Sequence, residues 1–396
     1  MKKIIFFLIL IVVVFPNAFR FFKFFLVGLI FIFLYNKLNS VFFNKYRRFL
    51  FFGLLISVFY IAFGQLFSKQ PYLSFIQSTA VYIIFPIFWI LFSDYILTKF
   101  SPLYILKYLT MFGFLACCSV FLTLWLIDNN YKEYLLLIIE DPKKTISSDG
   151  VVELSLHVYG SLLFLIPAIV TSINQFSLIK KYILLSVLFF SVVYSGRSVL
   201  IISFLIGVIG YFITSRAKIN SIIILLVTIG IASALISYFE IPIIAIWKLS
   251  LQKITEINEH DVRNIQFWEF LKGIQDYYYL FGHGHGVGID FIRHEKYFWR
   301  GYELLPMATL YRVGVLGLIS YSLPFIFSLR KYYSLFLRKK NTVIDDFFIF
   351  GIIGIVVGSL TNPYLESFDF QLLYFISFCY FINRKFHKMN KNIENT

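Results

Sequence analysis

Apolar runs long enough to cross a membrane follow one another along almost the whole chain. A spanning helix needs roughly 20 mainly apolar residues to cross about 30 Å of hydrocarbon, and its backbone groups must bond to one another there. We therefore predict an all-α, polytopic integral membrane protein with about twelve transmembrane helices, ten at the fewest. The predicted spans lie at about 4–19, 21–36, 49–67, 73–97, 103–127, 157–175, 181–196, 198–214, 219–239, 304–329, 345–362 and 368–383.

The composition supports this class and excludes others. Of the 396 residues, 59% are hydrophobic and only 14% are charged, which is too apolar for a soluble domain. The net charge of +15 does not indicate a nucleic-acid partner, because the basic residues are scattered in short loops. Cys117, Cys118 and Cys379 match no disulfide framework and no metal spacing, so no cofactor is predicted. No shift in composition marks a second domain, and residues 1–396 are treated as one membrane domain.

The distribution of charge predicts the topology. Met1-Lys2-Lys3 and the apolar run after it resemble a signal peptide, but no small-residue cleavage site follows, so we expect a retained first span. Lys and Arg concentrate in alternate short loops, which places both termini in the cytoplasm. Two longer segments, 128–156 and 241–303, then face outward. The second holds the densest group of ionisable and glycine residues in the chain.

An isolated arginine, Arg197, stands between two apolar runs. No acidic residue lies within ten positions of it, and Gly196 before it permits a tight turn. One interpretation is an interfacial arginine whose side chain reaches the lipid headgroups. The other is a phosphate ligand, because a guanidinium makes two charge-assisted hydrogen bonds with such a group. Its place at the predicted outer edge, against the inner bias of basic residues, favours the second.

Residues 260–279, in the second outer loop, have the pattern of an amphipathic helix, which Asp261 can cap. An apolar residue recurs there every three positions: Val262, Ile265, Trp268, Leu271 and Ile274. Arg263 would lie in the first turn, beside backbone N–H groups that favour anions. Alternatively, Arg263 pairs with Glu259 or Glu269 on a solvated face. The residues alone do not decide between these two interpretations.

A glycine-rich stretch, Gly282-His283-Gly284-His285-Gly286, follows this helix. Alternating glycines let a backbone approach a ligand closely or adopt positive φ values. A phosphate-binding loop of the Walker type is not indicated, since its lysine is missing. The histidines match no metal signature, even with neighbours taken into account, so no metal site is predicted. We interpret His283 as a structural residue.

Further candidates follow in the same outer loop. His294, like His285, is a candidate proton-transfer group. Arg293 and Arg300 are candidate substrate contacts. Arg293, His294 and Arg300 all lie between the glycine-rich stretch and the tenth predicted span.

Arg312 lies inside the next apolar run, two residues before Gly314. A charge at membrane depth usually faces the interior of a helix bundle, and with Glu303 upstream it could line a polar cleft. The alternative is a position at the membrane interface. In the last outer turn Glu366 and Asp369 supply carboxylates, which we interpret as salt-bridge partners of the arginines rather than as catalysts.

Four segments, taken in order, resemble one protein family. They are Ser195-Gly196-Arg197-Ser198 before a span; Arg263, Trp268 and the Phe281-Gly282-His283-Gly284-His285-Gly286 end of the outer loop; Arg312-Val313-Gly314-Val315-Leu316-Gly317-Leu318; and Thr361-Asn362-Pro363-Tyr364-Leu365. Their order and spacing, over roughly residues 182–374, are similar to those of the Wzy-type O-antigen polymerases and the related O-antigen ligases.

The resemblance implies a GT-C-like glycosyltransferase of the bacterial inner membrane, independent of metal, that acts in lipopolysaccharide or other surface polysaccharide biosynthesis. Its substrate would be an oligosaccharide repeat unit on undecaprenyl pyrophosphate, held in an outer-facing cavity among membrane lipids. Arg197, Arg263 and Arg312 would bind the pyrophosphate. A flippase and a chain-length regulator are candidate partners.

The chain departs from the family at one position. The ligases and many polymerases carry a His-Asn pair upstream of the glycine turn, where this chain has Glu303. A ligase is therefore less favoured than a polymerase, and the general base is open between Glu303 and His294. A flippase or other transporter would place charges along a path between both faces, whereas most candidates here collect on one face. A structural or receptor role fits poorly with positive charge facing outward.

Overall fold

The computed structural model describes residues 2–35, 40–67, 72–131, 133, 143–146, 152–214, 262–275, 279–289 and 302–393. The regular secondary structure within these ranges is helical apart from one short β-hairpin. Five of the described helical segments are long and apolar enough to cross a membrane: Phe42–Leu66, Tyr72–Lys99, Pro102–Asp128, Leu178–Ser195 and Leu305–Leu337. These segments indicate a multi-pass membrane protein, in agreement with the sequence.

The chain forms two compact units. The first consists of Met1–Ile30, Phe100–Glu256 and Lys339–Ile355, and the second of Phe31–Lys99, Ile257–Arg338 and Val356–Thr396. The first unit contains α1 (Lys2–Val14), most of α2 (Arg20–Tyr35), α6 (Pro102–Asp128), β1 (Lys143–Ile146), β2 (Val152–Ser155), α8 (Tyr159–Ser172), η2 (Ile173–Gln175), α9 (Leu178–Ser195), α10 (Ser198–Thr214) and most of α15 (Val343–Gly358).

The first unit is built around α8, in which every residue is buried. A helix that is apolar on all sides belongs in the interior of a bundle, and α8 packs against α6 and α10. Glycines on α10 and α15 allow these two helices to approach the backbone of α8 closely. A Cβ on Gly207 would lie 2.9 Å from the Pro167 Cα, and a Cβ on Gly354 only 2.2 Å from the Leu163 carbonyl oxygen. Small residues at such contacts are typical of membrane helix packing.

The short β-hairpin lies within the predicted outer segment 128–156. Strands β1 and β2 pair antiparallel, with Lys143 opposite Ser155 and Ile146 opposite Val152. The chain then enters α8 almost directly, so the hairpin lies at the start of the buried helix.

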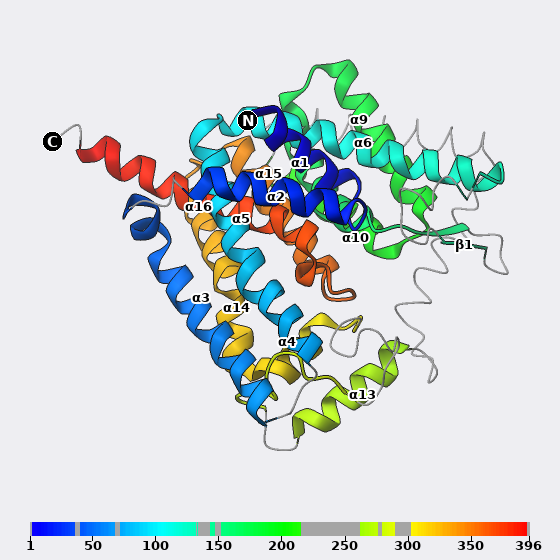
Figure 1. Ribbon diagram of the computed structural model, residues 1–396. Helices are drawn as coiled ribbons and strands as arrows, with labels where there is room; N and C mark the ends of the chain where they lie inside the picture. The colour runs from blue at the N-terminus through cyan, green and yellow to red at the C-terminus, as the bar shows by residue number, and fades with distance from the viewer. Residues whose placement is uncertain are drawn as a thin grey trace. The chain divides into compact units, whose positions relative to one another are not determined.

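The second unit holds four long helical segments, namely α3, the continuous α4–η1–α5, α14 and α16, together with shorter elements. It contains α3 (Ser40–Phe67), α4 (Tyr72–Thr79), η1 (Ala80–Ile84), α5 (Phe85–Lys99), α13 (Val262–Gln275), α14 (Leu305–Leu337), η4 (Tyr364–Glu366) and α16 (Phe368–Ile393). Helix α16 packs along α5, and α14 packs against both α3 and α16 (Figure 1). The turn η1 is π-helical and joins α4 to α5 without a break.

The predicted spans agree with the helices wherever the structure describes them, but several helices are longer. Helix α3 begins at Ser40 rather than at residue 49, and α14 continues to Leu337 rather than to residue 329. The extensions carry the basic residues that we placed in loops, because Lys and Arg are good helix formers and their long side chains reach water from a helix end. The predicted span 219–239 lies outside the described residues.

The loop helix is confirmed as α13, but its buried face differs from the expected one. Gln266 and Phe270 are fully buried and Ile274 nearly so, whereas Trp268 is 59% exposed. Residues three apart on an α-helix are separated by about 300°, so a strict three-residue repeat drifts around the helix, while a four-residue repeat stays on one face.

Candidate functional site

Helix α14 of the second unit is interrupted at Gly314. At Gly314 the backbone has φ 61° and ψ −172°, which is not helical. The glycine-rich loop runs beside this break and bonds the backbone groups that it frees. His283 and Gly284 donate to the Tyr311 and Arg312 carbonyl oxygens at 2.9 and 2.7 Å. In return, the Val315 N–H donates to the Tyr279 carbonyl. Irregular backbone at membrane depth is tolerated only when it is satisfied in this way.

The alternating glycines are explained by contact with protein backbone. Gly282 and Gly284 have φ values of 74° and 97°, which favour glycine. A Cβ on Gly282 would lie 2.5 Å from the Arg312 carbonyl, and one on Gly284 would lie 2.2 Å from the Gly64 nitrogen in α3. The third glycine, Gly286, also has a positive φ, of 86°. The loop is therefore clamped between α14 and α3.

A buried ion pair lies beside the break. Arg312, which is only 1% exposed, donates from Nη1 to Glu366 Oε1 at 2.7 Å. The same carboxylate oxygen accepts a hydrogen bond from the Tyr82 hydroxyl at 2.5 Å. The Arg312 guanidinium also lies over the Tyr302 ring, 5.3 Å from its centroid. A buried pair is tolerated when further hydrogen bonds and polar contacts of this kind surround it. The prediction that Glu366 pairs with an arginine is confirmed.

His285 extends this polar cluster. Its ring stacks on Tyr82 with centroids 3.7 Å apart, and its Nε2 lies 2.7 Å from the Tyr321 hydroxyl, which in turn lies 2.9 Å from Ser57 Oγ. Burial lowers the pKa of His285 well below its usual range, and the charge of Arg312 lowers it further. His285 is therefore neutral at pH 7. His283, by contrast, stacks on Tyr311 and bonds the Gly273 carbonyl, as a structural residue would.

A cavity of about 880 Å³ lies inside the second unit, and Tyr82, Tyr321, Ser57 and Glu366 form part of its wall. Most of the other lining side chains are apolar, and they come from α3, α5, α14 and α16. A largely apolar cavity with a few convergent polar groups is the usual form of a ligand site. We call Ser57, Tyr82, His285, Arg312, Tyr321 and Glu366 the wall cluster.

A second ion pair lies where α13 meets the start of α14. Arg263 donates from Nε to Glu303 Oε2 at 2.7 Å, and the Glu303 N–H donates to Gln266 Oε1 at 2.8 Å. The Arg263 side chain is 38% exposed and that of Glu303 15%. Arg263 is thus in the first turn of α13, as predicted, and Glu303 is a carboxylate partner that the sequence did not suggest; Glu259 lies outside the described residues. Leu305, two residues after Glu303, lines the cavity.

Arg197 belongs to the first unit and is not part of the wall cluster. Gly196 ends α9 with φ 61°, which confirms the tight turn. The Arg197 Nε donates to the Leu154 carbonyl of β2 at 3.1 Å, and its N–H donates to Ser195 Oγ. This arginine therefore anchors the hairpin to the turn between α9 and α10.

The structure groups some predicted residues and adds others. It brings the 282–286 loop, Arg312 and Glu366 together, whereas Arg293, His294 and Arg300 lie outside the described residues. Tyr82 and Tyr321 were missed, because tyrosine is frequent in this chain, at 27 residues, and nothing in an apolar run distinguishes these two. The polar triplet Gln77-Ser78-Thr79 just before Tyr82 is the signal that could have directed attention to that helix.

Comparisons with models of known protein families, with curated proteins and with solved structures find no match. A functional proposal must therefore depend on the residues of the site and on their chemistry.

Proposed function

We propose that this protein is a glycosyltransferase that joins oligosaccharide repeat units linked to undecaprenyl pyrophosphate, as the O-antigen polymerases do. The observation that carries the proposal is the cavity of about 880 Å³ in the second unit. It is mostly apolar, yet a carboxylate and two tyrosine hydroxyls converge on its wall. Such a cavity suits an amphiphile whose lipid part contacts the apolar lining and whose polar part meets the hydroxyls and carboxylate.

Arg263 is the candidate pyrophosphate ligand. It is partly exposed, it lies in the first turn of α13, and its carboxylate partner Glu303 stands just before the cavity-lining residues of α14. A pyrophosphate could take the place of that carboxylate, since both accept charge-assisted hydrogen bonds from a guanidinium. The exchange would release Glu303 at the moment when substrate arrives.

The released carboxylate would then serve as the general base. An acceptor hydroxyl attacks the anomeric carbon of the donor sugar, and its proton passes to Glu303. The bond between the anomeric carbon and the pyrophosphate oxygen breaks, and undecaprenyl pyrophosphate leaves with the electron pair. Arg263 stabilises the negative charge that builds on the leaving group, so it acts more strongly in the transition state than in the ground state. His294 stays an alternative base.

Arg312 has a different role in this proposal from the one the sequence suggested. It is 1% exposed and lies behind Glu366, so a phosphate could reach it only if Glu366 moved. We assign Arg312 to holding the Glu366 carboxylate in its orientation at the cavity wall. Arg197 stays a candidate phosphate ligand, with its Leu154 contact as the bond that it would give up.

The reaction would take place on the outer face of the inner membrane, where the charge distribution places Arg263 and Glu303. A flippase would deliver the lipid-linked units to that face, and a chain-length regulator would set the product size. The flippase and the chain-length regulator are partners that the proposal requires.

The test is the surface-glycan profile of a strain that lacks the gene and is complemented with variants. Wild type restores a ladder of long chains, and Arg263→Ala yields single-repeat capping. Lys272→Ala, an exposed change in the last turn of the same helix α13, should restore the ladder fully. Immunoblotting of the membrane fraction confirms that each variant is present.

The rival functions give other profiles. A ligase predicts no capped glycan at all in the deletion strain, and a transporter predicts repeat units trapped on the cytoplasmic leaflet. A full ladder from Arg263→Ala would remove the role assigned to that arginine. Long chains in the deletion strain itself would contradict the polymerase proposal.

A further inference from the structure

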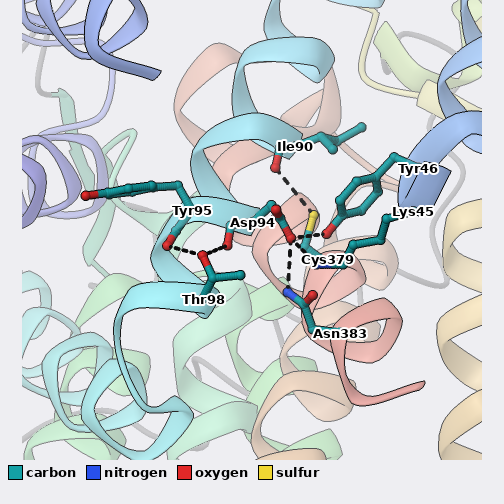
Figure 2. Close-up of polar contacts among 8 residues, drawn as sticks. All are labelled: Lys45, Tyr46, Ile90, Asp94, Tyr95, Thr98, Cys379 and Asn383. Atoms are coloured by element: carbon teal, nitrogen blue, oxygen red, sulfur yellow. Dashed lines mark hydrogen bonds and ion pairs between the residues drawn. The ribbon is translucent and has the colours of Figure 1, made fainter. Parts of the chain in front are cut away.

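A second polar cluster lies in the same unit, centred on Asp94 of α5 (Figure 2). Its carboxylate oxygen Oδ1 accepts from the Lys45 ammonium, from the Tyr46 hydroxyl at 2.8 Å and from Asn383 Nδ2 at 3.3 Å. Lys45 and Tyr46 belong to α3, and Asn383 belongs to α16. One carboxylate therefore joins three helices.

The cluster lies one helical turn beyond one end of the cavity. Arg48, Ile90 and Phe378 line the cavity, and they lie two to five residues from Tyr46, Asp94 and Asn383 on α3, α5 and α16, respectively. Cys379, next to Phe378, is fully buried and donates its thiol hydrogen to the Ile90 carbonyl. This bond joins α16 to α5 beside the charged cluster.

The chemistry of the cluster indicates closure rather than ligand binding. Oδ1 accepts all three donors, one of them a full positive charge, so the charge of the carboxylate is already compensated within the protein. The side chains of Lys45 and Asp94 are only 9% and 15% exposed, which makes separation of the two charges costly. Separation of α3 from α5 would break the bonds of Lys45 and Tyr46, and separation of α16 from α5 would break the bond of Asn383.

We infer that the Asp94 cluster seals the cavity at the end where α3 begins, so that water and solutes on that side of the membrane do not reach the wall cluster. The charge distribution predicts this side to be cytoplasmic. The inference does not depend on what the cavity binds. It distinguishes a protein that works from one face from a transporter that exposes its site to both faces.

Cys379 offers a native reporter for the test. With Cys117 and Cys118 changed to alanine, Cys379 is the sole thiol of the full chain. A membrane-impermeant maleimide is added to intact cells or to inverted membrane vesicles, and the labelling rate is measured from each face. Cys379 should label slowly from both faces in this background. Asp94→Asn should raise the rate by about tenfold or more from the face where α3 begins, the change expected from loss of one hydrogen bond to a charged group.

Two further variants are measured in the same assay, a milder change in the cluster and a control. Asn383→Ala removes one neutral donor and leaves the ion pair intact, so it should raise the rate in the same direction but less, even if Asp94→Asn folds poorly. Thr98→Ala on α5 is the matched control, because the bonds of Thr98 in Figure 2 go only to the Asp94 and Tyr95 carbonyls of its own helix. It should leave the rate unchanged.

Three results would overturn the inference. The first is rapid labelling of Cys379 from the α3 face in the background protein. The second is an unchanged rate in both Asp94→Asn and Asn383→Ala. The third is an equal rise from both faces, which would indicate general loosening. None of these measurements uses a glycan. The inference about the seal can therefore be overturned while the proposed glycosyltransferase function stands, and the reverse also holds.

Discussion

The second unit contains two polar clusters built around buried carboxylates, and they differ in the backbone that carries them. In the wall cluster, Tyr82 comes from a π-helical turn, Glu366 from a 3₁₀ turn, His285 from the glycine loop and Arg312 from beside the break in α14. The Asp94 cluster comes from regular stretches of three helices. Irregular backbone brings the polar groups of the wall cluster together beside the break in α14, whereas regular helices hold the side chains of the Asp94 cluster against one another.

The difference in burial adds to this contrast. The Arg312–Glu366 pair is more deeply buried, at 1% and 6% side-chain exposure, than the Lys45–Asp94 pair, at 9% and 15%. A deeper pair is more costly to break by removal of one partner, because the remaining charge has no access to water. The two clusters should therefore respond to the same kind of substitution with different magnitudes.

The largest effect is expected for Glu366→Gln. It leaves Arg312 as an uncompensated buried charge, which costs about 3–5 kcal/mol of stability. Thermal unfolding of the purified protein in detergent measures the loss. The double variant Arg312→Met/Glu366→Leu should recover most of that stability, because replacing both charges by apolar groups is often neutral. Equal stability of the single and double variants would contradict this explanation of the pair.

The next effect concerns the clamped loop. Gly284→Ala should destabilise the protein by about 2 kcal/mol or more, since the residue has φ 97° and its Cβ would lie 2.2 Å from the Gly64 nitrogen. Gly288→Ala, in the same loop, is the control and should cost much less, because Gly288 is not among the glycines with positive φ. Comparable midpoints of thermal unfolding for the two variants would show that the loop is not clamped.

Asp94→Asn should have a smaller effect on stability than Glu366→Gln. We expect a loss of about 1–2 kcal/mol, because the neutral amide keeps some of the contacts and the Lys45–Asp94 pair is less deeply buried than the Arg312–Glu366 pair. The same unfolding assay compares the two, with Thr98→Ala as the neutral reference. A larger loss for Asp94→Asn than for Glu366→Gln would reverse the proposed ranking of the clusters.

The last effect, confined to acidic pH, is a pH dependence that originates at His285. Its pKa in the folded protein is depressed, so the folded state prefers the neutral ring. This contribution to stability is constant above the unfolded pKa of about 6.5 and is lost as pH falls below it, by up to about 1.4 kcal/mol per pH unit.

Unfolding midpoints between pH 8 and pH 5 measure this loss. His285→Gln should show a weaker decline than wild type, because glutamine does not titrate and can still meet the Tyr321 hydroxyl. The groups facing His285 are Tyr60, Tyr82, Tyr321 and the permanently charged Arg312, none of which titrates in that window in its usual range. Parallel pH profiles would rule out His285 as the origin.

The sequence predicted the helices better than the site. Hydrophobic runs located α6, α10 and α15 closely, because membrane-spanning length and apolar composition are local properties. The loop helix α13 and the turn at Gly196 were predicted for the same reason. The bond between Tyr82 and Glu366 joins residues 284 positions apart and depends on a π-helical turn, which no local pattern indicates.

The glycine-rich loop also shows which features the sequence could predict and which it could not. Its sequence correctly indicated positive φ values and close backbone approach. What it approaches, the break in α14 and Gly64 in α3, could not be predicted, because that depends on how distant segments pack. The division of the chain into two units was also not predictable, since each unit combines segments that are far apart in the sequence.

The central claim is that the cavity of the second unit is the place where lipid-linked glycan units are joined. The most direct measurement is the product distribution when the purified protein in lipid nanodiscs receives undecaprenyl-pyrophosphate-linked repeat units. The account predicts chains of two or more repeats with release of undecaprenyl pyrophosphate by wild type and by Lys272→Ala, and neither product from Glu303→Gln or Arg263→Ala. Unconverted single repeats with the wild-type protein, or full chains from both site variants, would contradict it.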